Sequence, residues 1–375
     1  MVLSETQLAI REGVRAFAQE RIRPNSAGFE RAGGYPDGLF EELGSLGLFG
    51  LIAPAAYGGS DADYVSYALS LIELAAADGA LSTIVSIQNS ILISGLLKDG
   101  TPEQKQRFLP ELISGRMIGA FALTESDAGS DAAAIRTRAE RVAGGWRLTG
   151  SKQFITSGQI AKVVMAVAVT DPAAGRKGMT AFLVPTDRIG YVVDKVEHKM
   201  GQAASDTCAL RFDDLFVEDD LVLGAPGEGY RIALANLETG RIGIAAQAVG
   251  MAQAALEIAV AYAKSRVSMG RAIIEHQAVG FRLADLATRL EAARLMVLSA
   301  AALRDAGIPA LKEASMAKLY ASEMAEVVVS GAIQTLGGYG YLEELGLAKL
   351  YRDVRVCQIY EGTSDIQRMI IARAL

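Results

Sequence analysis

The chain has 375 residues, of which 51% are hydrophobic and 21% are charged, and its formal net charge at pH 7 is −6. At about 150 residues per domain this length predicts two or three domains, and the composition excludes disordered and fibrous proteins. A negative net charge provides no field to hold the phosphates of DNA or RNA, so nucleic acid is not expected as a partner.

The cysteines and the apolar stretches indicate in which cellular compartment the protein is expected. Cys208 and Cys357 are the only cysteines and lack paired spacing, which predicts neither a disulfide framework nor a zinc cluster. The N-terminus has no basic stretch followed by an apolar run. The longest apolar stretch, Ile242 to Ala263, is interrupted by Gln and Glu, so it is expected to be a buried helix. The sequence therefore predicts a cytoplasmic protein without a membrane span.

Helical spacing marks the first part of the chain. Ser4 and Gln7 form a capping-box pattern ahead of apolar residues that recur at three- and four-residue intervals. A second helix is predicted to open at Pro36, and another to cover Tyr64 to Gly79. Residues 1–115 are therefore predicted to form an all-helical domain.

The pattern changes near Ile118, where short β-branched and aromatic runs begin to alternate with Gly, Asp and Pro. Such runs predict a middle antiparallel β domain over residues 116–226. The predicted strands lie at Phe121–Leu123, Trp146–Thr149, Val163–Val169, Met179–Val184, Tyr191–Val193 and Thr207–Phe212.

The helical period returns in residues 227–375, which are predicted to form a third domain. Its four expected helices are Tyr230–Ala263, His276–Ala306, Pro309–Thr335 and Ser364–Leu375. Helices this long, with a surplus of apolar faces, indicate a bundle that is also buried in an oligomer. The predicted fold class is α+β, in the order helices, sheet, helices.

Several kinds of chemistry are excluded by residue count and spacing. Only two histidines, His198 and His276, are present, so a three-histidine metal site is impossible and a His-Glu-x-x-His helix is absent. No metal is predicted. The chain has no Gly-x-Gly-x-x-Gly after a strand, and Gly145–Lys152 misses the P-loop pattern because Ser and Lys are reversed. General-base chemistry is therefore expected from a carboxylate.

Three segments combine glycines with polar side chains. Phe121–Asp131 is predicted to run from a strand into a turn, which is either a plain connection or a lining for a planar ligand. The glycines of Gln334–Tyr341 either stop a helix or let a phosphate approach the backbone. In Ile359–Gln367, a capping box of Ser364 and Gln367 would place Glu361 in the turn before a helix.

Glu361 is the singular residue of the third segment. Burial in an apolar turn would raise the pKa of its carboxyl group, and the nearby helix N-terminus would oppose that rise. Taken alone, the residue is either structural or a catalytic base.

Together the three segments resemble the acyl-CoA dehydrogenase family, over essentially the whole chain. Leu123-Thr-Glu-x-x-Ala-Gly-Ser-Asp131 is similar to the family's first signature. Gln334-x-x-Gly-Gly-x-Gly-Tyr341, with Arg352-Asp353 and Tyr360-Glu-Gly-Thr363, is similar to its second. The resemblance implies an N-terminal helical domain, a middle β domain and a C-terminal four-helix bundle, assembled as a homotetramer made of two dimers.

The resemblance further implies that the cofactor is FAD, bound between the β domain and the bundle. The residues expected around the flavin are Phe121, Leu123, Thr124, Phe154, Ile155 and Thr156. Those expected at the phosphates and the rest of the cofactor are Ser130, Arg266, Gln277, Thr363 and Asp365, with Gln334, Gly337 and Gly338 from the neighbouring subunit. One departure is Met269, which stands where the family has Phe and retains an apolar side chain.

By the same resemblance, Glu361 removes the α-hydrogen of an acyl-CoA while the β-hydrogen leaves as hydride to the flavin, giving a trans-2-enoyl-CoA. The backbone N–H of Glu361 and a ribityl hydroxyl are expected to stabilise the enolate oxygen. An electron-transfer flavoprotein is the expected acceptor. Some branches carry the base immediately before Arg241, where this chain has Gly240. The expected substrate contacts are Ser130, Tyr230, Glu238, Arg241, Tyr360 and Gly362.

Substrate class is less narrowly defined by the resemblance. Segments 86–90, 238–247 and 312–318 are most similar to short-chain and short-branched-chain members, which implies fatty acid or branched-chain amino acid catabolism. Ser82 stands where the decarboxylating glutaryl branch has arginine. The alternatives are a carrier-protein-bound or unusual thioester and a non-catalytic acyl-CoA-binding relative. Glu238 and Arg241, three residues apart, could equally form a surface ion pair.

Overall fold

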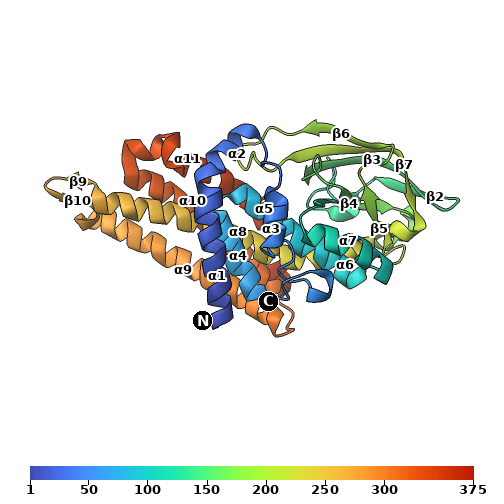
Figure 1. Cartoon of the computed structure of the whole chain (residues 1–375), viewed down its shortest axis with the longest axis horizontal. Coiled ribbons are helices and arrows are strands. Elements are labelled where there is room, and N and C mark those ends of the chain that lie inside the picture. Colours follow the sequence, from blue (N-terminus) through green and yellow to red (C-terminus); the bar gives the residue numbers. More distant parts are fainter.

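The computed structural model describes all 375 residues and arranges them in three successive parts (Figure 1). Helices of the first and third parts pack against each other, and the sheet of the middle part lies at one end of the long axis (Figure 1). The predicted order of helices, sheet and helices is confirmed.

The N-terminal part contains seven α-helices. They are α1 (Glu5–Phe17), α2 (Ser26–Ala32), α3 (Leu39–Ser45), α4 (Tyr64–Ala77), α5 (Gly79–Ile87), α6 (Ser94–Asp99) and α7 (Pro102–Ile113). The predicted capping box of α1 is present, with Ser4 and Gln7 each accepting a hydrogen bond from the other's backbone N–H. The helix predicted to open at Pro36 begins three residues later, after a turn. The helix predicted to reach Gly79 ends at Ala77, because Asp78 caps the next helix.

The middle part is one sheet of eight strands. They are β1 (Gly119–Ala122), β2 (Arg138–Val142), β3 (Gly145–Thr156), β4 (Val163–Val169), β5 (Met179–Pro185), β6 (Tyr191–Val196), β7 (Thr207–Glu218) and β8 (Val222–Leu223). The order is β6-β7-β3-β2-β4-β5-β8, with β1 also paired to β4.

Strand direction corrects the prediction of a fully antiparallel domain. The pairs β1–β4 and β2–β4 are parallel, and all other pairs of this sheet are antiparallel. The hairpin of β2 and β3 lies between β1 and β4 in the sequence, so the chain returns to β4 in the direction of β1. β2 escaped prediction because four of its five side chains are exposed, which removes the apolar signal.

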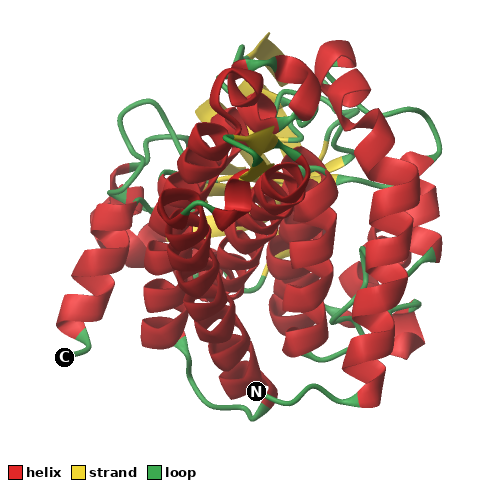
Figure 2. Ribbon diagram, turned by 90° about the vertical axis from the view of Figure 1, so that its left-hand side faces the viewer, coloured by secondary structure: helices red, strands yellow, loops and turns green.

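The C-terminal part contains α8 (Gly229–Ser265), α9 (Gln277–Asp305), α10 (Leu311–Leu336), α11 (Leu347–Val354) and α12 (Ser364–Arg373). A hairpin of β9 (Val267–Ser268) and β10 (Arg271–Ala272) joins α8 to α9. α10 packs against α8, α9 and α12, so these four helices form the predicted bundle. Figure 2 shows the helices side by side in front of the sheet.

The central helix of the molecule is α8, which packs against α4 and α5 of the N-terminal part as well as against the bundle. Two helical stretches, Gly79–Asp99 and Gly229–Ser265, are long and apolar enough to cross a membrane. However, 94% and 72% of their most apolar 18-residue windows are buried inside the fold. Burial of that extent is what core helices show, and it places the apolar stretch from Ile242 inside the molecule.

Candidate functional site

Glu361 lies in a backbone turn immediately before α12. Its φ is +53°, and the φ of the following Gly362 is +91°. A non-glycine residue in the left-handed region stores strain and persists only where the surroundings hold it. The strain marks this turn as a functional candidate.

The Glu361 carboxylate lies against Gly240 of α8. A Cβ atom at Gly240 would stand 2.0 Å from Oε2 of Glu361. The carboxylate therefore occupies the space that a side chain at position 240 would fill. Oε2 is buried and has no hydrogen-bond partner. A buried carboxylate oxygen without a partner is costly in a fold and suits a group that must accept a proton from a ligand.

Burial raises the pKa of Glu361 from 4.5 to about 7, and the charges of Lys318 and Arg241 oppose the rise. The predicted upward shift is therefore confirmed. The opposing influence comes from these two cations and not from the helix N-terminus that the sequence suggested. A base with a pKa near neutral is well matched to proton transfer at pH 7.

The N-cap of α12 corrects the predicted capping box. Thr363, not Ser364, is the N-cap, and its Oγ1 accepts a hydrogen bond of 3.3 Å from the N–H of Ile366. Gln367 is fully buried and donates to the carbonyl oxygens of Gly362 at 2.9 Å and of Glu361 at 3.3 Å. The predicted pairing is wrong because Gln367 is used to hold the strained turn.

Tyr360 is part of a buried polar network. Its hydroxyl donates to Oε1 of Gln247 on α8 and accepts from Nε2 of Gln202 at 3.4 Å. Both of these glutamines also contact the hydroxyl of Thr83. The network joins the three parts of the chain directly beside Glu361. Sequence reasoning missed its other members, since isolated Gln and Thr residues carry no pattern.

Glu238 and Arg241 on α8 do not pair with each other. Arg241 is 5% exposed, and its Nε has no partner. Glu238 instead pairs with Arg304 of α9, with 2.9 Å between Nη1 and Oε1. The alternative of a Glu238–Arg241 surface ion pair is therefore wrong, because Arg304 satisfies the glutamate.

Tyr230 lies at the start of α8, under the guanidinium of Arg176, which is 5.3 Å from the centre of its ring. The ring packs against the core of the sheet domain. At 1.5 Å per residue, Tyr230 is about 16 Å along α8 from Arg241. The structure therefore places Tyr230 at the edge of the sheet domain and not beside Glu361.

The first signature segment is held by a buried ion pair. Lys152 of β3 is 1% exposed and donates to Oε1 of Glu125 at 2.8 Å and to the carbonyl of Leu123 at 3.0 Å. Glu125 also accepts from the backbone N–H groups of residues 136 and 137. The segment carrying Leu123, Thr124 and the exposed Ser130 is thereby fixed. Sequence reasoning missed Lys152 because the predicted strand ended at Thr149, whereas β3 continues to Thr156.

A bulge in β3 turns Phe154 out of the sheet. The register with β7 shifts between Lys152 and Ile155, and the φ of Phe154 is +60°. Phe154 is 63% exposed, whereas Ile155 enters the core. An exposed ring at a strained position is unfavourable in water and fits a planar aromatic ligand such as a flavin. Thr156 follows as a half-buried residue at the end of the strand.

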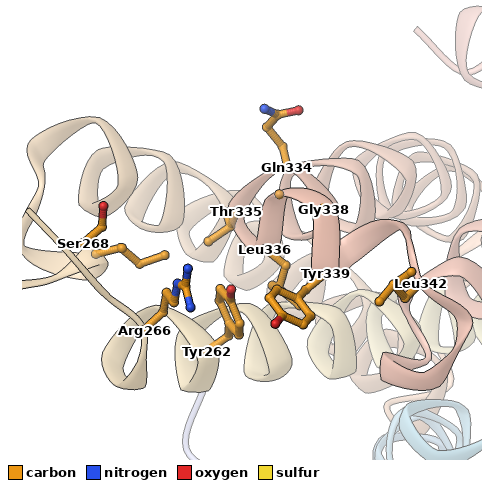
Figure 3. Close-up of a pocket in the computed structure, with 11 residues that line it drawn as sticks. Tyr262, Arg266, Ser268, Gln334, Thr335, Leu336, Gly338, Tyr339 and Leu342 are labelled. Atoms are coloured by element: carbon orange, nitrogen blue, oxygen red, sulfur yellow. The ribbon is translucent and has the colours of Figure 1, made fainter.

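A cavity of about 530 Å³ opens at the end of α8 and α10 (Figure 3). Four predicted cofactor residues line it within one chain, namely Arg266, Gln334, Gly337 and Gly338. Figure 3 shows Arg266 beside Tyr262, with Gln334 extending away from them. Gln277 is not among the lining residues, and contribution from a neighbouring subunit stays a prediction.

Gly338 fits a phosphate ligand for a physical reason. Its φ is not left-handed, and no atom lies within 4 Å of where its Cβ would stand, so the fold itself does not require glycine there. A bare backbone near the guanidinium of Arg266 is the arrangement that a pyrophosphate needs. Thr363 and the exposed Asp365 lie elsewhere, at the start of α12.

Comparisons with known proteins agree with this geometry. Sequence profiles for the N-terminal, middle and C-terminal domains of acyl-CoA dehydrogenase match residues 4–116, 120–215 and 227–375. An acyl-CoA dehydrogenase of Bacillus subtilis (strain 168) is 45% identical over 375 residues, which cover 100% of this chain and 99% of the relative. The mitochondrial short-chain specific acyl-CoA dehydrogenase of Bos taurus is 42% identical over 370 residues, covering 99% and 90%.

Solved structures are similarly close. The butyryl-CoA dehydrogenase of Megasphaera elsdenii matches with a TM-score of 0.97 and 38% identity, covering 100% of this chain and 99% of that one. A chain from a study of the electron transferring flavoprotein of Acidaminococcus fermentans matches with a TM-score of 0.98 and 38% identity, covering 100% and 98%. The chain therefore belongs to the acyl-CoA dehydrogenase family, and it is a FAD-dependent oxidoreductase that acts on acyl-CoA.

Proposed function

We propose that this protein dehydrogenates a short or short-branched acyl-CoA to the trans-2-enoyl-CoA, with Glu361 as the base that takes the α-proton. The observation that carries the proposal is the buried Oε2 of Glu361, which has no partner in the chain and lies in the space left by Gly240. With a pKa of about 7, this carboxylate is ionised in a large fraction of molecules at neutral pH and accepts a proton readily.

The backbone of the same turn provides a second group for the reaction. The N–H of Glu361 makes no hydrogen bond to another backbone group, so it is free to donate to the thioester oxygen. Charge that develops on this oxygen as the α-proton leaves would be stabilised by such a fixed donor. Bound FAD would supply the acceptor for the β-hydrogen, which leaves as hydride. One proton and one hydride thus leave the substrate, and a carbon–carbon double bond forms.

A short acyl chain is favoured by the packing next to Gly240. A Cβ at Gly243, one turn further along α8, would lie 2.2 Å from Oγ of Ser86 and 2.6 Å from the hydroxyl of Tyr67. Tyr67 is fully buried, and its pKa is sensitive to the charge of Glu361, so it lies close to the proposed base. These side chains fill the interior beyond the carboxylate. The short-chain and butyryl-CoA names of the relatives agree with that filling.

The proposal also covers the FAD contacts, the domain bounds, the electron acceptor, the oligomeric state and the cellular location. The FAD contacts are those predicted from the sequence, and the domains are residues 1–115, 116–226 and 227–375. An electron-transfer flavoprotein is proposed as the acceptor, and the similar structure from a study of the electron transferring flavoprotein of Acidaminococcus fermentans supports it. Exposed aromatic side chains on the bundle, at Phe281, Tyr339 and Tyr341, support a tetramer. A cytoplasmic location stays a prediction.

An anaerobic titration tests the proposal. The purified protein should have the visible spectrum of a flavin, and butyryl-CoA or 2-methylbutyryl-CoA should bleach it at lower concentration than octanoyl-CoA does. Bleaching by octanoyl-CoA alone would contradict the short-chain assignment. A flavin that none of the three thioesters bleaches would instead support a carrier-bound or unusual thioester.

A further inference from the structure

Lys318 is a fully buried charged residue on α10 that the reaction scheme above does not use. Its exposed fraction is 0%, and its ammonium donates a single hydrogen bond, of 2.7 Å, to the carbonyl oxygen of Gly362. Lysine is almost never fully buried without a carboxylate partner, because desolvation of the ammonium is costly. A fold that retains this cost is expected to use the ammonium.

The carbonyl that Lys318 binds belongs to the strained turn. Glu361 and Gly362 are consecutive left-handed residues, and their carbonyl oxygens are held by buried side chains from two helices. Lys318 reaches the Gly362 carbonyl from α10, and Gln367 reaches both carbonyls from α12. Strain of this kind persists only where several contacts determine it. The two side chains therefore supply what the left-handed conformation of Glu361 requires.

The charges around the Glu361 carboxylate come from different helices. Lys318 on α10 is the larger influence that opposes the burial-induced rise in the pKa of Glu361, and Arg241 on α8 is the smaller. The charge of Glu361 also raises the pKa of Tyr67 on α4. Burial lowers the pKa of Lys318 itself to about 8, and Cys357 and Glu361 oppose that change.

The same ammonium is influenced by Arg241, which lowers its pKa, and by Glu323 further along α10, which raises it. Glu323 is engaged by Arg368 of α12, with 2.6 Å between Nη2 and Oε1. With a pKa of about 8, Lys318 is still largely protonated at neutral pH, and its ammonium acts on the turn through a hydrogen bond.

We propose that Lys318 is a positioning residue for the dehydrogenation: its ammonium, bound to the carbonyl of Gly362, holds Glu361 in the left-handed conformation that sets its carboxylate over Gly240. The inference rests on the proposed role of Glu361 as the base. It has two parts that can be separated, a geometric one through the carbonyl and an electrostatic one through the charge.

Two substitutions distinguish the geometric part from the electrostatic part. K318M removes both the hydrogen bond and the charge at nearly constant volume, whereas Q367M removes only neutral donors to the same turn. The measurement is the rate of flavin reduction by butyryl-CoA under anaerobic conditions, as a function of pH. K312M on the same helix is the matched control, because Lys312 is half-exposed and its ammonium lies 3.5 Å from Oε1 of the neighbouring Glu313.

In K318M we expect the limiting rate to fall about tenfold or more, since a small misplacement of a reacting group is costly. The acidic limb of the pH profile should move up by about one unit, because an opposing cation is lost. Q367M should lower the rate without moving the limb. K312M should match the unmodified protein. FAD content should be unchanged in all three.

A K318M protein with an unmodified rate and an unmodified pH profile would overturn the inference, and so would a slower K318M whose pH profile does not move. If K318M does not fold, K318Q carries the test, because it keeps a donor and loses the charge: the limb should move while most of the rate is retained. E361Q is measured in parallel. Turnover retained in E361Q would contradict the assignment of Glu361 as the base. An inactive E361Q together with an unaffected K318M would contradict only the positioning role of Lys318.

Discussion

The carboxylate of Glu361 occupies the volume that a side chain at position 240 would fill, with only 2.0 Å between Oε2 and the position of a Cβ on Gly240. The two residues are 121 positions apart in the printed sequence and belong to α8 and to the turn before α12. Because the crowded atom is the end of a flexible side chain, a clash here displaces the carboxylate more easily than it disturbs the fold.

G240A should therefore damage activity more than stability. We expect flavin reduction by butyryl-CoA to slow about a hundredfold, because the proposed base is moved from its position. The melting temperature should change little. G13A in α1 is the control, since nothing lies within 4 Å of the added Cβ. A G240A protein that reduces its flavin at the unmodified rate would contradict the placement of the carboxylate.

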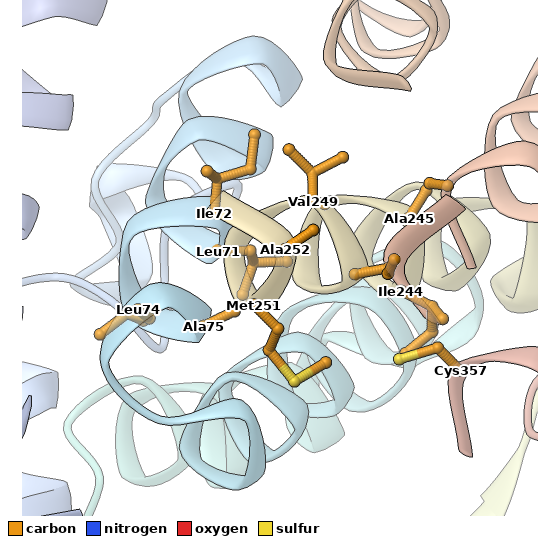
Figure 4. Packing of buried hydrophobic residues seen from close by; sticks show 14 of the residues in the cluster. Leu71, Ile72, Leu74, Ala75, Ile244, Ala245, Val249, Met251, Ala252 and Cys357 are labelled. Carbon is orange, nitrogen blue, oxygen red and sulfur yellow. The ribbon is translucent and has the colours of Figure 1, made fainter. Parts of the chain in front are cut away.

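G250A should have the opposite effect. A Cβ at Gly250 would stand 2.1 Å from the backbone carbonyl oxygen of Ile72, where α4 and α8 pack closely (Figure 4). Backbone cannot rotate away, so we expect a loss of about 3 kcal/mol in the free energy of unfolding, at the upper end for overpacking. Urea unfolding measures it, again with G13A as the control. If G250A lost less free energy of unfolding than G240A, the result would show that α4 and α8 can move apart to accept the added methyl group.

E361Q tests the base directly. The substitution keeps the shape of the side chain and removes its ability to take a proton, so we expect a rate loss on the order of a thousandfold with FAD retained. E344Q, at an exposed position near the end of the bundle, is the control. Rapid-mixing absorbance at the flavin band is the measurement. Comparable rates in E361Q and E344Q would exclude Glu361 as the base.

The raised pKa of Glu361 also predicts how stability depends on pH. The folded carboxyl group has a pKa of about 7 against 4.5 for the unfolded reference, so the native state binds more protons between these values. Its contribution to stability is therefore lost as pH rises from about 4.5 to 7. E361Q should melt above the unmodified protein at pH 8, and the difference should shrink towards pH 5. A constant difference between pH 5 and pH 8 would argue against the shift.

Lys152 offers a stability test in the sheet. K152M would leave Glu125 buried without its cation, and breaking a buried ion pair in this way costs about 3–5 kcal/mol. Urea unfolding should register the loss, and FAD should be released more easily because the first signature segment is no longer fixed. K162M, at an exposed position of the same domain, is the control. Equal FAD retention in K152M and K162M would disconnect the ion pair from the cofactor.

Period and turn chemistry were sufficient to predict the long elements. The four C-terminal helices and α4 carry continuous helical spacing, and six strands carry β-branched runs, so each of these elements was found. β3 and β7 nevertheless extend seven and six residues beyond their predicted ends, at Thr156 and Glu218. β2 could not be found because its exposed polar side chains resemble a loop. Strand direction was mistaken at β4 because pairing across the β2–β3 hairpin is a long-range property that no local pattern encodes.

Site residues that lie within a sequence motif could be predicted. Contacts between residues far apart in the sequence could not. The turn sequence singled out Glu361 and predicted its raised pKa, whereas its role as the base came from the family resemblance. Gln367 was assigned to a cap because spacing alone cannot tell whether an amide turns outward or inward. The pairing of Glu238 with Arg304 could not be foreseen, since it depends on how α8 and α9 pack. Lys318 gave no signal, because a lysine on a helix is ordinarily at the surface.

The Tyr360 network has a consequence for how the protein matures. Thr83, Gln202 and Gln247 come from the N-terminal, middle and C-terminal parts, and they meet in one buried network with the hydroxyl of Tyr360. The turn that carries the proposed base is therefore completed only when all three parts have docked, so catalytic competence reports their docking.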